Sequence, residues 1–257
     1  QNNTFNSRII IKLRKRKADF LSYKILSCCM KHIIIDILSP MWCKGIFVSC
    51  TIIPLLLLVL KKQNESAHKS FMKITAVLAL LIWVFSVLYE IYNNIWTIQD
   101  SLPLHVSWVS FLILILFLWK PKQWMFEWSV FIGIPSGFHA LITPELPMGD
   151  SNWLVFYYYF SHIFLLLIPL YLIRIRGYKV RKFAWLNSYF YVQILVFINL
   201  PLNFIINSNY LFLREPPLAK NPFLIGDWPW YILVIECALF LHVLLLSFLF
   251  PSTKRIK

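Results

Sequence analysis

The feature that most constrains this chain is a series of seven long apolar runs. A helix rises about 1.5 Å per residue, so an apolar helix of about 20 residues matches the roughly 30 Å hydrocarbon core of a bilayer. The sequence therefore predicts an all-α membrane protein, a bundle of about seven transmembrane helices that forms one domain over residues 42–252. The predicted helices are Ile46–Leu60, Ile74–Ile95, Leu102–Trp119, Phe126–Ile142, Trp153–Ile173, Trp185–Ile206 and Pro229–Phe250.

Composition and charge favour the same class. The chain is 59% hydrophobic and 14% charged, whereas a soluble domain carries about a quarter charged residues. Its net charge of +14 would suggest nucleic acid as a partner in a soluble protein. Here most of the basic residues outside the N-terminal segment lie in short loops, where they keep those loops in the cytoplasm. We expect a multi-pass protein of the cell membrane whose partners are membrane lipids, with no nucleic acid.

The charge of the loops predicts an orientation. Basic residues gather at 61–73, 120–122 and 174–182 and in a basic tail at 253–257, whereas the second and fourth loops carry none. Because basic loops stay inside, the N-terminus of the bundle is expected outside and its C-terminus inside. The longest loop, Asn207–Trp228, is rich in Pro and Asn and is expected to be ordered against the mouth of the bundle.

The first residues, 1–41, form a basic arm that has no clean signal-peptide pattern. An arm of this charge also conflicts with an outside N-terminus. We expect it to be non-native or disordered, with the native start at Met30 or Met41.

Polar and ionisable side chains recur inside the apolar runs. Such groups are costly at membrane depth, so they usually face the bundle interior and mark function. In the predicted orientation they all lie in the outer half of the bilayer, which predicts a polar cavity that opens toward the outer face. The set comprises Glu90, His105, Ser107, His139, Ser161, His162, Asn199, Asn203 and Glu236.

Several members of this set also fit simpler roles. Glu90, His105 and His139 are placed where interfacial residues reach water, and Ser107 is a small residue of the kind that packs membrane helices together. The two Asn residues fit hydrogen bonding between helices. His162 and Glu236 are hardest to explain in this way, because both lie well inside apolar runs. Glu127 is expected to be interfacial and His242 to be structural. The segment Gly133–Gly137 predicts a kink.

Five sequence segments together resemble a known family. They are Leu102–His105, His139–Leu146, Ser161-His162, Asn209–Pro217 and Gly226–Tyr231. Their order and spacing resemble the YwaF-type family of bacterial integral membrane proteins, over roughly residues 75–250. That family is itself similar to a eukaryotic transmembrane family regarded as lipid acyltransferases.

The resemblance implies a nucleophile on one helix and a His on another. The bacterial pattern has a Cys two residues after the His that opens helix three, and here Ser107 takes that position. The His of the pair maps to His162. A Ser hydroxyl can attack an acyl carbonyl when an imidazole accepts its proton, and Glu236, Asn203 or His105 are candidates to orient that imidazole. The sixth-loop candidates for the cavity or for substrate binding are Asn209, Tyr210 and Arg214.

The main alternative is a transporter or binding protein for a small polar solute, which would use the same cluster as a mid-bundle site. No phosphate loop, dinucleotide motif or metal-ligand spacing occurs in the bundle, so neither a cofactor nor a metal is expected. The bundle-mouth histidines suit zinc or iron chemically, but their spacing forms no motif.

Overall fold

The computed structural model describes residues 32–219 and 221–250, and within them the chain is a bundle of helices. Seven apolar helices follow one another, which confirms the predicted all-α class and the number of crossings. Six of them are long and apolar enough to span a bilayer, and α4, with 14 residues, is shorter. The helices are α2 (Pro40–Lys61), α3 (Glu65–Tyr92), α4 (Val106–Trp119), the joined α5 (Gln123–Trp128), η1 (Ser129–Gly133) and α6 (Ile134–Ile142), α7 (Asn152–Arg174), α8 (Ala184–Ile206) and α9 (Trp230–Leu249).

The helix α2 begins earlier than the predicted Ile46. The Ser39 side chain accepts a hydrogen bond from the Trp42 amide at 3.2 Å, and Pro40 occupies the first position of the helix. Both features are typical of a helix start. The apolar run by itself could not show this beginning, because the first turn is only partly apolar.

The helix α3 also begins early, at Glu65 instead of Ile74. The Asn64 side chain caps it by accepting a hydrogen bond from the Ala67 amide at 2.9 Å. Lys69 and Lys73, which were assigned to the first loop, therefore lie on the helix. The other predicted helix ends lie within four residues of those observed.

The fourth crossing bends at the π-helical turn η1, which is followed by Pro135. A π turn and a Pro both interrupt the regular hydrogen-bond ladder of a helix. The bend brings α6 onto α7, where Gly137 lies against the backbone of α7. A Cβ on Gly137 would lie 3.0 Å from the His162 carbonyl oxygen, so the absence of a side chain sets how closely the two helices approach.

A short strand pair closes one end of the bundle. The strand β1 (Ile33–Ile34) pairs antiparallel with β2 (Glu145–Leu146), and the neighbouring Ile35 is buried. The last residues of the predicted N-terminal arm thus pack on the bundle. Residues 1–31 and the basic tail at 253–257 lie outside the described residues.

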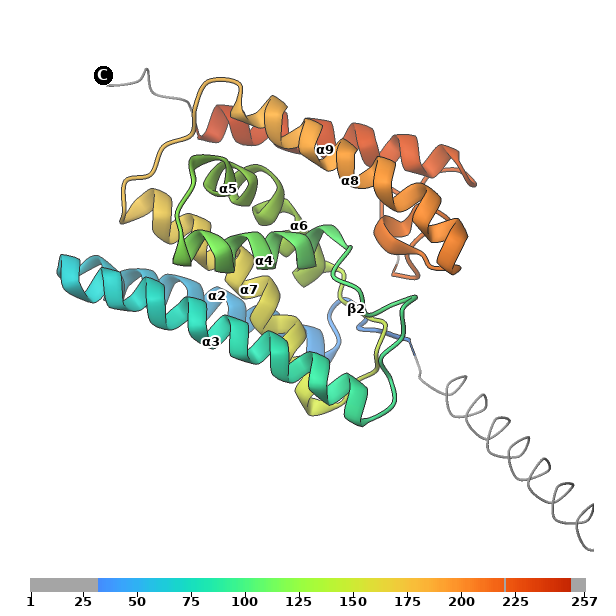
Figure 1. Cartoon of the computed structure of the whole chain (residues 1–257), viewed down its shortest axis with the longest axis horizontal. Coiled ribbons are helices and arrows are strands. Elements are labelled where there is room, and N and C mark those ends of the chain that lie inside the picture. Colours follow the sequence, from blue (N-terminus) through green and yellow to red (C-terminus); the bar gives the residue numbers. More distant parts are fainter. Residues whose placement is uncertain (1–31, 220, 251–257) are drawn as a thin grey trace, which may run out of the picture.

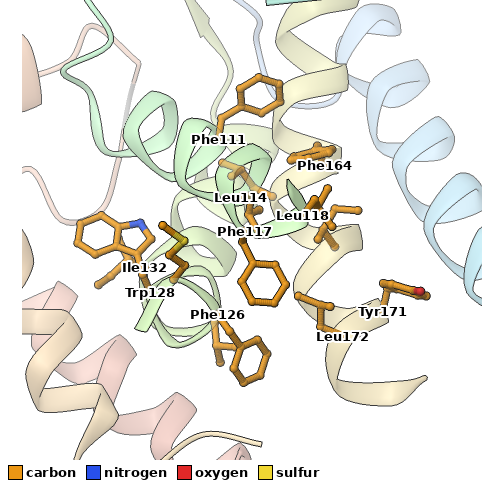
Figure 2. Packing of buried hydrophobic residues seen from close by; sticks show 14 of the residues in the cluster. Phe111, Leu114, Phe117, Leu118, Phe126, Trp128, Ile132, Phe164, Tyr171 and Leu172 are labelled. Carbon is orange, nitrogen blue, oxygen red and sulfur yellow. The ribbon is translucent and has the colours of Figure 1, made fainter. Parts of the chain in front are cut away.

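The bent helix and α7 form the centre of the molecule. In their most apolar stretches, 67% and 56% of residues are buried inside the protein, against 17% or less for α2, α3, α8 and α9. Figure 2 shows the core between them, in which side chains of α4, α5 and α7 such as Phe117, Phe126 and Leu172 interdigitate. The outer helices expose large apolar side chains, including Phe197 and Phe248, as expected for surfaces that contact lipid.

Figure 1 shows how the helices flank this centre. The helices α8 and α9 run side by side along one flank of the bundle. On the other flank, α2 and α3 each pack on α7. The loops that begin near Tyr92, Ile142 and Ile206 all lie at the same end of the bundle, beside β2.

Candidate functional site

A cavity of about 630 Å³ lies at this end of the bundle. Its walls come from the end of α3, the start of α4, α6, the first half of α7, the middle of α8 and much of α9, and from the second, fourth and sixth loops. These elements are far apart in the sequence and meet because consecutive helices run in opposite directions. The predicted site residues that line it are Glu90, His105, Ser107, His139, Ser161, His162, Asn209 and Glu236.

Four other predicted site residues, Asn199, Asn203, Tyr210 and Arg214, do not line the cavity. The Asn203 Oδ1 accepts hydrogen bonds from the Tyr210 amide at 2.8 Å and from Ser208 Oγ at 2.7 Å. The Arg214 guanidinium donates to the Asn203 carbonyl oxygen at 3.2 Å. The Asn199 amide group donates to a carbonyl of its own helix. In this structure Asn203, Tyr210 and Arg214 hold the sixth loop against α8.

Tyr210 also connects the sixth loop to the second loop. Its hydroxyl donates to the Ile98 carbonyl oxygen at 2.8 Å and accepts from the Leu102 amide at 2.9 Å. Burial raises the pKa of Tyr210 to about 12, and a phenol is protonated and able to donate at neutral pH even at its ordinary pKa. This network fixes the loop that leads into α4, and thereby the start of the helix that carries Ser107.

His162 is buried in α7, and its tautomer follows from its partners. The Nδ1 atom lies 2.7 Å from the Tyr158 carbonyl oxygen, one turn earlier. A carbonyl oxygen can only accept, so a neutral His162 carries its proton on Nδ1 and has the lone pair on Nε2. A backbone carbonyl therefore orients this imidazole. Within the described chain, neither Glu236, Asn203 nor His105 hydrogen-bonds to it, although the sequence suggested these three for that role.

Ser107 lies in the first turn of α4 and lines the same cavity as His162. Among the described residues the two side chains form no hydrogen bond to one another. Ser161 is adjacent to His162, but its hydroxyl donates to the Tyr158 carbonyl oxygen at 2.9 Å and lies beside Nδ1, the ring nitrogen that carries the proton. Ser161 is thus poorly placed to use Nε2 as a base.

A pair of histidines joins α6 to α9. The Nε2 atoms of His139 and His242 are 3.0 Å apart, and the His242 Nδ1 lies 2.6 Å from the Ala238 carbonyl oxygen. In the neutral pair, His242 keeps its proton on Nδ1, so His139 Nε2 donates to His242 Nε2. The sequence suggested a structural role for His242. It lines the cavity, and no spacing in the sequence could have paired it with His139.

Glu236 lies between α9 and α8. One of its oxygens, Oε2, accepts hydrogen bonds from Gln193 at 2.7 Å and from Tyr189 at 3.2 Å. These partners hold the side chain toward α8. Tyr189 and Gln193 did not stand out in the sequence as site residues, although their spacing of four residues places them on one face of a helix.

The lining of the cavity is acidic, whereas the chain as a whole is basic. Five of the eleven carboxylates in the sequence line it, and no Lys or Arg of residues 32–219 and 221–250 does. The five are Glu90, Asp100, Glu145, Glu215 and Glu236. Across the described stretches, no group of three or more His, Cys, Asp or Glu side chains is arranged to hold a metal ion.

Comparisons with known proteins address the family of the chain. No curated protein matches it, and no solved structure matches it either. A family model does match, and it covers residues 30–247, which include every element of the bundle from β1 to nearly the end of α9. The chain is a polytopic membrane protein that belongs to the TMEM164 family.

Proposed function

We propose that this protein transfers or hydrolyses acyl groups of membrane lipids, with Ser107 as nucleophile and His162 as general base. The observation that carries the proposal is the state of His162. Its Nδ1 is tied to the Tyr158 carbonyl oxygen, so its basic Nε2 is available in a cavity that Ser107 also lines. An imidazole whose one nitrogen is fixed by an acceptor is prepared to take a proton at the other.

The chemistry proceeds in two stages. Ser107 Oγ attacks the ester carbonyl of a lipid while His162 Nε2 takes its proton, and the proton then passes to the departing alcohol oxygen. The acyl group is now an ester of Ser107. A second alcohol, or water, attacks that ester with His162 again as base, and Ser107 recovers its proton. The product is an acylated alcohol in the first case and a fatty acid in the second.

The two side chains must approach one another for this reaction. A nucleophile and its base act at about 2.6–3.2 Å, and such contacts are often long before substrate binds. The resemblance of the chain to YwaF-type proteins, and through them to eukaryotic lipid acyltransferases, supports the assignment. In that pattern a Cys stands at the position of Ser107.

The test is acyl transfer from a labelled phospholipid by the purified protein in detergent or nanodiscs. We expect Ser107→Ala and His162→Gln to lower the rate by about a thousandfold or more, because a nucleophile and its base act as a unit. Ser107→Cys is expected to keep activity, since a thiol is the more readily activated nucleophile. Ser247→Ala serves as the control, because that hydroxyl bonds within α9 and lies outside the cavity.

Binding or transport of a small polar solute is the second candidate function, and the acidic lining favours it for a cationic solute. The two functions make different demands on Ser107. If the protein shows no acyl chemistry, or if Ser107→Ala is as active as the wild type, the acyl-transfer proposal fails and solute binding takes its place.

A further inference from the structure

The carboxylates of the cavity differ in whether other groups of the protein already hydrogen-bond to them. Glu145 accepts hydrogen bonds from the Leu218 and Ala219 amides and faces His32 at 2.7 Å. Glu236 accepts from Tyr189 and Gln193. Asp100 is tied to Thr97 in its own loop. These carboxylates have a structural explanation that needs no ligand.

Glu90 is explained in this way only in part. It lines the cavity from the last turns of α3, its side chain is buried at 2% exposure, and its Oε2 has no hydrogen-bond partner among the described residues. The Trp153 indole N–H is not free to serve it, because that group donates to Ser86, one turn earlier on α3. Ser101 hydrogen-bonds to the carboxyl group, but the buried Oε2 is left without a donor, which is costly. Its presence at a cavity wall points to a ligand that pairs with this oxygen.

The surroundings of Glu90 indicate which ligand. The rings of Trp108 and Tyr157 line the cavity with it and meet edge to face, with centroids 6.5 Å apart. Aromatic faces beside a carboxylate are the usual means by which proteins recognise an alkylammonium group. An anionic group would instead face the five carboxylates of the lining, with no described Lys or Arg to offset them.

We propose that Glu90 is the counter-ion for an alkylammonium group of the ligand, held against Trp108 and Tyr157. Two kinds of ligand carry such a group, a zwitterionic phospholipid with its head group and a free amine. The site does not depend on the reaction at Ser107. With a lipid ligand, it would make Glu90 a specificity-determining residue for the proposed acyl transfer.

The test is the shift in thermal unfolding of the full chain in detergent, followed by its Trp fluorescence, as ligand is titrated. The probes are short-chain phosphatidylcholine, phosphatidylethanolamine and phosphatidylglycerol below their micelle concentrations, and choline and ethanolamine chloride. We expect at least one ammonium probe to stabilise the wild type and phosphatidylglycerol to do so about tenfold less effectively. A response to the lipids alone identifies the head group, and a response to the free salts identifies an amine solute.

The matched variants are Glu90→Gln and Asp150→Asn, which remove the same charge inside and outside the cavity. Asp150 is exposed and does not line it. We expect Glu90→Gln to weaken binding of the ammonium probe about tenfold or more, because the substitution removes one partner of a desolvated charge pair. Asp150→Asn is expected to bind like the wild type, and so is Ser107→Ala, even when that variant has lost acyl transfer.

Three results would contradict the proposed ammonium site. They are equal stabilisation by phosphatidylglycerol and phosphatidylcholine, unchanged binding by Glu90→Gln, and an equal loss in Asp150→Asn. The first uses only the wild type, so it decides the matter even if Glu90→Gln does not fold. Failure of acyl transfer with intact ammonium binding would reject the proposed function and leave the site in place.

Discussion

At the residue scale, Glu127 of α5 forms an ion pair with Arg181 of the loop between α7 and α8. The Arg181 Nη2 lies 2.7 Å from Oε2, its Nε lies 2.9 Å from Oε1, and its backbone amide also donates to Oε1. The hydrogen bond to Glu127 raises the pKa of Arg181. The Glu127 side chain is 3% exposed, so this carboxylate is buried against the loop between α7 and α8.

Replacing Arg181 is therefore expected to destabilise the bundle. Arg181→Ala leaves a buried carboxylate without its charged partner, and we expect a loss of about 2–3 kcal/mol. Arg181→Lys should retain only part of the lost stability, because an ammonium cannot pair with both carboxylate oxygens in the same way. Thermal unfolding in detergent measures the effect. The control is Glu127→Gln with Arg181→Ala. If the double variant is no more stable than Arg181→Ala, the loss does not come from the unpaired charge.

At the element scale, the bend in the fourth crossing decides how close α6 comes to α7. At Gly137 a Cβ would lie 2.9 Å from the Leu165 Cβ and 3.0 Å from the His162 carbonyl oxygen. At Gly133 it would find only ordinary contacts, the nearest at 3.7 Å. Both glycines lie in the bent helix, so they form a matched pair for substitution.

We expect Gly137→Ala to destabilise the protein by about 1–3 kcal/mol, because overpacking at a backbone contact forces the two helices apart. The shift would also displace the turn of α7 that carries His162 and lower any activity that depends on it. Gly133→Ala should change the midpoint of thermal unfolding far less. Similar midpoints for the two variants would show that the approach at Gly137 is not limiting.

At the scale of the whole molecule, Glu145 connects three distant parts of the chain. It lies in β2, faces His32, and accepts from the amides of residues 218 and 219 in the sixth loop. Burial opposes ionisation of Glu145, but His32 and the two amides outweigh it and lower its pKa below the ordinary value of 4.5. A group with a lowered folded pKa contributes stability above its unfolded pKa, and that contribution is lost as the pH falls through the folded pKa.

The wild type should therefore lose stability relative to Glu145→Gln as the pH falls below about 4.5, since Gln has no charge to lose. At neutral pH, Glu145→Gln should release the sixth loop and increase its cleavage in limited proteolysis. Thermal midpoints of both proteins between pH 3 and 7 check the first expectation. A constant difference between them across this range would show that Glu145 does not carry the acid dependence.

Much of the molecule follows from the order of apolar and polar residues. The seven crossings, their sequence and the gathering of polar side chains at one end of the bundle are determined locally, because bilayer thickness fixes helix length and alternating direction fixes which ends meet. The helix starts at Pro40 and Glu65 were missed because capping acts through polar residues that hydropathy ignores.

The sequence by itself determined the membrane class, the helices and the membership of Ser107, His162 and Glu90 in one polar set. Only the tertiary structure decided what each member does. Asn203, Tyr210 and Arg214 bond to one another and hold the sixth loop, and His139 contacts His242. The Oε2 atom of Glu90 has no hydrogen-bond partner among the described residues. The physical reason is that a hydrogen bond depends on distances of a few tenths of an ångström between groups up to a hundred residues apart, and no local pattern encodes these distances.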